Sequence, residues 1–222
     1  MRLNDISHLK LNLDIDSKKL KSELNTLNDL YRYKNYSSRV FGVKRKYKKA
    51  WSGISLYGTN GDINDDIHDK EKNRGFAFVK PTELQKVVPY MYDIVNKIYG
   101  NSTKSIVRLM RIAPKSSLFW HSHVQELRQD KTMLTIQIPI KCPKGFKYCV
   151  VDKDEFKWWK RFHKPNWFKS LSEFEMEECK AYYFNSFHYH NVYNPTDEYR
   201  TALMFYVDYN HPHIKELINK SL

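Results

Sequence analysis

The sequence predicts an α+β fold that is mostly β, with helices near the N-terminus and many short strands after them. Two patterns predict it. Before residue 100 apolar residues recur at helical spacing, whereas from residue 105 short apolar runs alternate with turn residues. Many short strands favour a sandwich or a barrel, and helices can cover one of its faces. The chain has 222 residues, no internal repeat and no glycine-rich linker, so we expect a single domain over 1–222.

The first 50 residues are predicted to form an N-terminal arm. Leucines alternate with polar residues over 8–14, which is typical of a strand. Ser17 can cap a helix with leucines on one face, and the polar, basic residues 32–50 predict a loop. The helix leucines are Leu20, Leu24, Leu27 and Leu30, and the sharpest cluster of cations, in the loop, is Lys44, Arg45, Lys46, Lys48 and Lys49.

The main region, 51–210, opens with a strand and a long loop. Residues 51–58 predict a short strand, and the charged, turn-rich residues 58–75 predict a loop long enough to be functional. FAFVK, residues 76–80, is consistent with the end of a further strand.

A second helix is predicted over 82–99. Thr82 and Gln85 form a capping-box pattern, and apolar residues at helical spacing follow them. Pro89 falls inside this pattern and predicts a kink or a break, because proline cannot donate the helical hydrogen bond. Gly100 suits the C-terminal cap.

The remaining pattern is one of short strands with a single interruption at 156–168. That segment, FKWWKRFHKPNWF, combines three Trp, three Phe and several cations. Three interpretations stay open: aromatic packing on the core, a lip over a site, or a platform for single-stranded nucleic acid. The predicted strands cover 105–113, 117–121, 132–140, 147–152, 173–178, 180–185, 190–193 and 199–209.

Composition excludes some classes of protein and leaves others open. No window holds the roughly eighteen consecutive apolar residues of a membrane helix, and the first sixteen residues lack the apolar core of a signal peptide, so we expect a cytoplasmic protein. The net charge of +13 permits an acidic partner such as nucleic acid, but the Lys-, Asn- and Ile-rich composition makes this weak support. The cysteines form no CxxC pair, and we expect free thiols at Cys142, Cys149 and Cys179.

Two histidine pairs point to a metal site. His121 and His123 lie in the stretch from Arg108 to Pro139 between apolar runs, and His188 and His190 follow another such run. Residues two apart in a strand face the same side, so either pair could bind one ion. Imidazole suits Zn, Fe, Cu or Ni, and the ligand type alone does not choose among them. The alternative is that these are ordinary polar histidines of the core or the surface.

Arg200 opens an otherwise apolar strand, TALMFYVDY. A buried cation needs an anionic partner, and the guanidinium fork matches a carboxylate with two hydrogen bonds. A metal and this arginine could together hold a small dicarboxylate. The alternative is a structural salt bridge with Asp197, Glu198 or Asp208.

Two stretches carry a longer pattern than the histidine pairs alone. The first reads RLMRIAP, then WHSH with its first histidine ten residues after Arg111, then TIQIPI. The second reads YYFNSFHYHNVYN and continues into YRTALMFYVDY. Together they resemble the aspartyl/asparaginyl β-hydroxylase-like family of Fe(II)- and 2-oxoglutarate-dependent oxygenases, which includes free-proline hydroxylases. The resemblance covers 51–210 and is most specific in 108–140 and 181–209.

This resemblance implies a double-stranded β-helix, the cupin-like jelly roll, with the N-terminal helices packed on one sheet. It implies Fe(II) as the metal, with His121 and His190 as ligands, and 2-oxoglutarate as cosubstrate bound by Arg200. Thr135 and Gln137 occupy the positions of the family's second 2-oxoglutarate contact. The implied reaction hydroxylates a free amino acid or a peptide or protein side chain and releases succinate and CO2. Residues expected around the ligands or at the edge of the substrate pocket are His188, Trp120 and Asn194.

The chain departs from the family pattern at the acidic iron ligand, where it has His123. Three interpretations follow. His123 is a third nitrogen ligand, or the carboxylate position is filled by water, or the site is degenerate and the protein is a jelly-roll binding protein. A nucleic-acid-modifying oxygenase is a further alternative, suggested by the net charge and by residues 156–168. Our leading prediction is the hydroxylase with His123 as third ligand.

Overall fold

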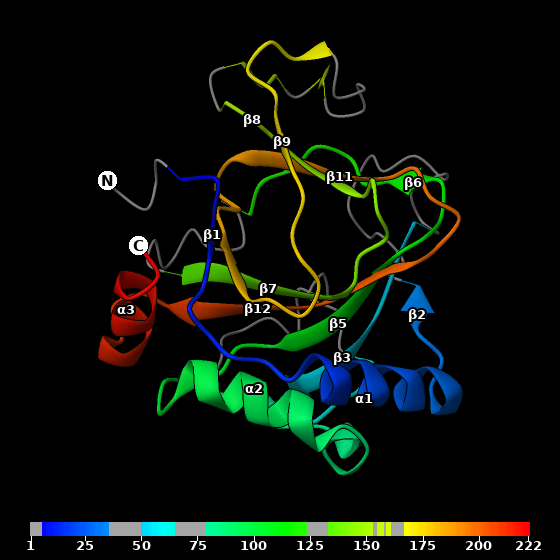
Figure 1. Ribbon diagram of the computed structural model, residues 1–222, viewed down its shortest axis with the longest axis vertical. Helices are drawn as coiled ribbons and strands as arrows, with labels where there is room; N and C mark the ends of the chain where they lie inside the picture. The colour runs from blue at the N-terminus through cyan, green and yellow to red at the C-terminus, as the bar shows by residue number, and fades with distance from the viewer. Residues whose placement is uncertain are drawn as a thin grey trace.

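The computed structural model describes residues 6–35, 50–64, 79–123, 133–152, 155–157, 159–160 and 167–222, without the side chains of residues 34 and 35. Two antiparallel sheets and three α-helices make up this part of the chain (Figure 1). The basic cluster at 44–49, residues 65–75 of the long loop and residues 161–166 of the aromatic segment lie outside the described residues.

The large sheet has the strand order β1-β10-β7-β12-β5-β3-β2, with β4 paired to β3, and the small sheet has the order β6-β11-β8-β9. The strands of the large sheet are β1 (His8–Lys10), β2 (Lys34–Asn35), β3 (Trp51–Thr59), β4 (Val79–Pro81), β5 (Val107–Ile112), β7 (Met133–Lys141), β10 (Tyr182–Phe184) and β12 (Arg200–Asp208). Those of the small sheet are β6 (Ser116–Ser117), β8 (Lys147–Val151), β9 (Ser172–Phe174) and β11 (Tyr189–Asn194).

From β5 to β12 the chain passes back and forth between the two sheets. Strands β5, β7, β10 and β12 form the centre of the large sheet, and β6, β8, β9 and β11 form the small sheet that faces it. Two four-stranded layers connected in this way make a double-stranded β-helix. The predicted fold class, mostly β with a jelly-roll core, is therefore confirmed.

The large sheet separates two different interiors. Along β7, Leu134, Ile136 and Ile138 belong to the core shared with the helices, whereas Thr135 and Gln137 face the opposite side, as alternation in a strand requires. The helix layer consists of α1 (Ser17–Leu30), α2 (Pro89–Tyr99) and α3 (Pro212–Asn219), and α1 and α2 lie below the sheet in Figure 1. A second apolar cluster fills part of the space between the sheets.

Helix α1 differs in two details from the prediction. Its N-cap is Asp16 and not Ser17, because the Asp16 carboxylate accepts hydrogen bonds from the amides of Lys18 and Lys19 at 3.0 and 3.1 Å. Leu30, predicted on the apolar face, is 63% exposed because the helix ends there, beyond the underlying core. The other three leucines of the pattern are buried as predicted.

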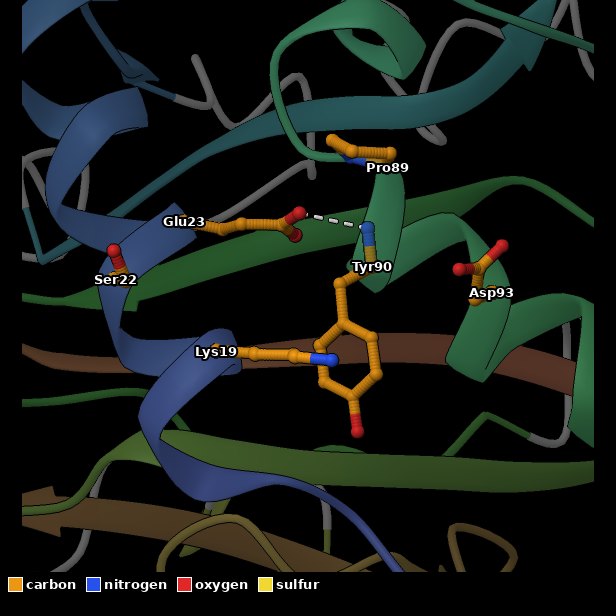
Figure 2. Close-up of a pocket in the computed structure, with 6 residues that line it drawn as sticks. All are labelled: Lys19, Ser22, Glu23, Pro89, Tyr90 and Asp93. Carbon is orange, nitrogen blue, oxygen red and sulfur yellow. Dashed lines mark hydrogen bonds between the residues drawn. The ribbon is translucent and has the colours of Figure 1, made fainter.

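The predicted helix over 82–99 is broken at Pro89, as expected. A 3₁₀ turn at Glu83–Lys86 follows the Thr82 cap, and α2 begins at Pro89 and ends at the Gly100 cap. Glu23 of α1 takes the place of an N-cap. Its carboxylate accepts hydrogen bonds from the amides of Tyr90 and Met91 at 2.7 and 2.8 Å, in a groove between α1 and α2 (Figure 2). This groove lies in the helix layer, on the far side of the large sheet from the jelly-roll interior.

The other predicted strands are found with shifts of a few residues, with three differences. The strand predicted over 117–121 is only β6, and beyond it His121 forms an isolated bridge. Strand β2 falls in the predicted loop, and helix α3 was not predicted. The three cysteines are free thiols as expected. Among the described residues, no helix is long and apolar enough to cross a membrane.

Candidate metal centre

His121 and His190 are held side by side by their own backbones. The amide of His121 donates to the carbonyl of His190 at 3.1 Å, and the amide of His190 donates to the carbonyl of His121 at 2.8 Å. This bridge places the start of β11 beside the segment that follows β6. Opposed residues of such a pair project to the same face, and the two imidazole centroids are 4.4 Å apart.

The His123 ring lies at the same point, but this residue is held by hydrogen bonds to the large sheet and to the residues that follow β10. Its amide donates to the carbonyl of Ser186 at 2.9 Å, and the Ser186 hydroxyl is hydrogen-bonded to Thr135 of β7 at 2.6 Å. The Tyr206 hydroxyl on β12 lies 3.1 Å from Nδ1 of His123. The His123 ring centroid is then 5.3 Å from that of His121 and 4.9 Å from that of His190. The sequence-predicted ligands are thus brought together.

Backbone carbonyls fix which nitrogen of two rings can bind a metal. Nδ1 of His121 lies 2.8 Å from the carbonyl of Phe119, and Nδ1 of His190 lies 2.9 Å from the carbonyl of His188. A carbonyl only accepts, so each Nδ1 carries the proton and each Nε2 carries the lone pair. Histidine ligands in metalloproteins are typically oriented by such a contact. One ligand nitrogen from each of the three histidines lies within 4.8 Å of the others, which is the arrangement of a site that could hold one ion.

The surroundings favour neutral imidazole at His190. Burial lowers the pKa of His190 well below its usual value, and the neighbouring His121 and His123 lower it further. The Phe184 ring stands nearly perpendicular to the His190 ring with centroids 5.0 Å apart, and this contact covers one side of the imidazole. A histidine must be neutral to ligate a metal, so the local electrostatics match that role.

Arg200 lies between the sheets in a cluster of polar side chains. It is 4% exposed, and its Nη2 donates to Oε1 of Gln137 at 2.7 Å and to the hydroxyl of Tyr148. The Tyr148 hydroxyl also donates to Oε1 of Gln137 at 3.1 Å. The alternative of a structural salt bridge is not found for Asp197 and Glu198, which pair with Lys115 and Lys141 instead.

Burial raises the pKa of Tyr148, and Arg200 opposes this shift. The phenol therefore stays protonated beside the guanidinium. Tyr148 and Tyr206 both belong to this region, and the sequence singled out neither of them. Strand alternation would place Tyr206 on the same face as Arg200, but nothing in the residue type or spacing of KYCVV marks Tyr148.

Some of the other residues expected near the site face the interior between the sheets, and others do not. Thr135 and Gln137 lie on the inner face of β7, one bonded to Ser186 and the other to Arg200. The carbonyl of His188 orients His190. Trp120 is buried against Phe168 with ring centroids 4.8 Å apart, in an apolar cluster behind the small sheet.

Asn194 is engaged in the turn that precedes β12. Its side-chain amide donates to the carbonyls of Ala113 and Glu198 at 3.0 and 2.8 Å, and its Oδ1 accepts from Thr196 at 2.7 Å. The Asn194 side chain therefore holds the turn between His190 and Arg200 in place.

The described part of the aromatic segment shows both packing and exposure. Phe156 stacks on Tyr189 with centroids 3.7 Å apart, and Phe168 is buried against Trp120. Trp159 and Trp167 are exposed. The packing interpretation therefore holds for the two phenylalanines.

Comparison with known proteins finds likeness of structure only. No family model and no curated protein matches the sequence. An oxidoreductase of the 2OG-Fe(II) oxygenase family from Burkholderia pseudomallei aligns over 92% of this chain and 86% of its own, with a TM-score of 0.52 and 11% identity. A prolyl hydroxylase from Trichoplax adhaerens, solved with a hypoxia inducible factor peptide fragment, aligns over 96% and 88%, with a TM-score of 0.56 and 9% identity. HygX from Streptomyces hygroscopicus, with nickel and 2-oxoglutarate bound, aligns over 90% and 82%, with a TM-score of 0.52 and 10% identity. At such identities these matches show the fold, which is the jelly roll of these oxygenases.

Proposed function

We propose that the protein is an Fe(II)- and 2-oxoglutarate-dependent dioxygenase that hydroxylates the side chain of an amino acid or a protein. The observation that carries this proposal is that one jelly roll holds both three converging imidazoles and a buried arginine, Arg200, which is hydrogen-bonded to Gln137. Either feature alone would fit many proteins. A 2-oxo dicarboxylate needs both, because one end chelates a metal and the other presents a carboxylate. The structural likeness to HygX, solved with nickel and 2-oxoglutarate, supports this proposal.

The histidines fit a transition metal. Imidazole nitrogens bind such ions at about 2.0–2.1 Å, so two ligand nitrogens around one ion are at most about 4.2 Å apart. The nitrogens of His121, His123 and His190 lie within 4.8 Å of one another, so the rings would turn inward to bind one ion. Non-haem Fe(II) oxygenases commonly use two histidines and a carboxylate. Here His123 would supply a neutral donor in place of the carboxylate, and the negative charge of the bound 2-oxo acid would offset more of the ion's charge.

Arg200 would hold the far carboxylate of 2-oxoglutarate. Nη2 of Arg200 is engaged by Gln137 and Tyr148, while Nε of Arg200 is buried and has no hydrogen-bond partner among the described residues. The guanidinium therefore keeps donor capacity for an incoming carboxylate, and Gln137 and Tyr148 fix its orientation. When bound, iron and 2-oxoglutarate supply the oxidative decarboxylation to succinate and CO2 that is coupled to hydroxylation of a substrate C–H bond.

The chain's own contribution is to orient these groups and to keep the interior dry. The carbonyls of Phe119 and His188 and the Tyr206 hydroxyl aim the three rings. Phe184 covers one side of His190. A preorganised, water-poor pocket strengthens electrostatic interactions with the bound groups.

The proposal is tested by loading the purified protein anaerobically with Fe(II) and 2-oxoglutarate. We expect the weak visible charge-transfer band of the iron–2-oxo acid chelate, and its loss in His190→Ala. The Arg200→Gln variant should need a much higher 2-oxoglutarate concentration to give the same band. Glu198→Gln is a matched control, because Glu198 lies near Arg200 in sequence and is paired to Lys141 at the surface.

Exposure to oxygen then separates the enzyme from a binding protein. An enzyme should form succinate, and a screen of free amino acids and peptides should accelerate this for the correct substrate class. Metal and 2-oxoglutarate binding without succinate would favour the alternative of a jelly-roll binding protein. Absence of both metal uptake and the band would overturn the proposal.

A further inference from the structure

The inner face of β7 carries three positions that give the interior between the sheets a direction. Gln137 is hydrogen-bonded to Arg200. Thr135, two residues earlier, is opposite Tyr206, whose hydroxyl contacts one of the three histidines. Met133 is two residues earlier again, at the start of the strand. Because residues two apart in a strand share a face and are about 7 Å apart, Met133 lies on the side of the candidate metal centre that faces away from Arg200.

This order separates the two molecules that the proposed reaction needs. A cosubstrate held at the metal centre and by Arg200 would occupy the interior on the Gln137 side. The apolar cluster between the sheets also extends to that side, since two of its members, Ile112 and Tyr182, are opposite Arg200 and Gln137. A substrate would therefore reach the metal from the other side, which is the side of Met133.

A small apolar cluster lines this second side. Met133 and Tyr206 are both buried in it, and Phe187 packs against them. Phe187 is only partly buried, so part of its surface is open to contact. The charged residue of the row, Asp208, is opposite Met133, and its carboxylate accepts a hydrogen bond from the amide of Asn210 at 2.8 Å. The wall is thus apolar from the row of Tyr206 to the start of β7.

The contacts that hold His123 also fix the position of this cluster. The Tyr206 ring stands at 80° to the His123 ring, with centroids 5.9 Å apart. Phe187 directly follows Ser186, whose carbonyl accepts a hydrogen bond from the His123 amide at 2.9 Å. The amide of Phe187 donates to Oδ1 of Asn185 at 3.2 Å. Phe187 is therefore held beside the candidate metal centre by its backbone as well as by its packing.

The chemistry of this wall favours an apolar group. Phe187 and Met133 offer a ring and a thioether, and the one hydroxyl of the cluster, that of Tyr206, contacts His123. An aliphatic group that contacts these side chains removes apolar surface from water, which is favourable. A carboxylate or a carboxamide in the same place would lose hydrogen bonds to water and gain none from the wall, which is costly.

We infer that Phe187 and Met133 form the wall that receives the side chain to be hydroxylated, so that the substrate is an amino acid or a peptide segment with an aliphatic side chain at the reacting carbon. This inference rests on the proposed function and adds two specificity-determining residues to it. It excludes aspartate and asparagine, the side chains after which the family that the sequence resembles is named. Arg200 takes the cosubstrate on one side of the metal centre, and the apolar wall takes the substrate on the other.

The test is a binding measurement on the full chain loaded with Zn²⁺, which is redox-inert, and 2-oxoglutarate. Isothermal titration calorimetry compares leucine, asparagine and aspartate, whose side chains have nearly the same shape. Each is offered as the free amino acid and as the N-acetyl amide, and the tighter form tells a free amino acid substrate from a peptide one. We expect the leucine probe to bind roughly tenfold or more tightly than the asparagine probe, because two methyl groups are buried in place of a carboxamide. The aspartate probe should also bind more weakly than the leucine probe.

Variants assign the preference to the apolar wall. Phe187→Gln should abolish the preference for leucine, whereas Phe187→Leu, which keeps an apolar side chain, should retain it. Phe174→Gln is the matched control and should also retain it, because Phe174 is likewise partly buried but packs on Tyr148, at the Arg200 end of the interior. Failure of the leucine probe to bind more tightly than the other two, or a leucine preference that survives Phe187→Gln, would overturn the inference.

A measurement on the wild type keeps the test decisive if Phe187→Gln does not fold, as judged by circular dichroism. Co²⁺ replaces Zn²⁺, and the paramagnetic relaxation of the N-acetyl leucine amide is measured by NMR. We expect the δ-methyl protons to relax faster than the acetyl methyl protons, because the side chain would lie nearer the ion. The opposite order would place the backbone of the probe at the metal and would contradict the inference.

Two further titrations keep this result separate from the proposed function. Binding of 2-oxoglutarate to the Zn²⁺-loaded protein is measured first, and its absence would count against the proposed function. The probes are also titrated into metal-free protein, where the preference for leucine and its dependence on Phe187 stand or fall without metal or cosubstrate.

Discussion

Replacing Tyr206 with phenylalanine tests whether His123 is held as a metal ligand. The substitution removes one hydroxyl, which lies 3.1 Å from Nδ1 of His123, and leaves the buried ring in place. Loss of one such hydrogen bond should lower the free energy of unfolding of the metal-free protein by about 1 kcal/mol. Loss of the group that orients a ligand typically lowers metal affinity by roughly tenfold or more.

Two measurements separate these effects. Urea unfolding of the metal-free protein gives the change in stability, and competition with a chromophoric chelator for Zn²⁺ or Co²⁺ gives the change in metal affinity. Tyr92→Phe is the matched control, because its hydroxyl is also buried and donates to the carbonyl of Leu56, but on the helix side of the large sheet. We expect both variants to lose stability and only Tyr206→Phe to lose metal affinity. Unchanged metal affinity in Tyr206→Phe would refute the reasoning that Tyr206 orients His123 as a ligand.

Three further predictions follow from the geometry. Gly100→Ala should lower the free energy of unfolding by about 1–2 kcal/mol in urea titrations, because Gly100 has φ of 57° and a Cβ there would lie 2.8 Å from the His213 ring; an unchanged midpoint would contradict this. Hydrogen bonds from the Ser170 hydroxyl and from the backbone lower the pKa of Glu155 to about 2, against a usual value of 4.5, so the stabilisation is present above pH 4.5 and is lost as the pH falls toward 2. The difference in stability between wild type and Glu155→Gln should therefore shrink over that range in unfolding curves measured at stepped pH, and a constant difference would exclude the carboxylate as its cause. His123→Asp should change the affinity for iron and the position of the chelate band. If iron affinity, band position and turnover all stay as in the wild type, the three-histidine hypothesis loses its support.

Features that depend on local spacing were predicted well from the sequence. The strand predicted over 132–140 is β7, in which the buried Leu134, Ile136 and Ile138 of the helix-side core alternate with Thr135 and Gln137 as the strand period requires. The break at Pro89 follows from its missing amide hydrogen. The jelly roll itself was predicted through the resemblance of two long motifs, and the order of strands in the two sheets bears it out.

Features that depend on contacts between the sheets could not be predicted. The contact of Tyr206 with His123 requires the register of β12 against its neighbours, which includes an irregularity between Thr201 and Ala202. Tyr148 meets Arg200 only because the small sheet is folded over the large one. The N-cap residue of α1 could not be predicted from the sequence either. Asp16 and Ser17 are both good capping residues, and residue type alone does not choose between them.

The backbone bridge between His121 and His190 means that two of the three proposed ligands would be in place before any ion binds. In small zinc domains the metal drives folding, and removal of the metal unfolds the chain. Here those two side chains lose their conformational entropy when the jelly roll folds, and not when the ion binds. A chelator should therefore remove the ion and leave a folded protein that can be reloaded. The third proposed ligand, His123, is hydrogen-bonded to Tyr206 of the large sheet and to Ser186, which follows β10 of that sheet. A bound ion would then cross-link the two sheets through these histidines, and its loss would loosen that contact without unfolding the protein.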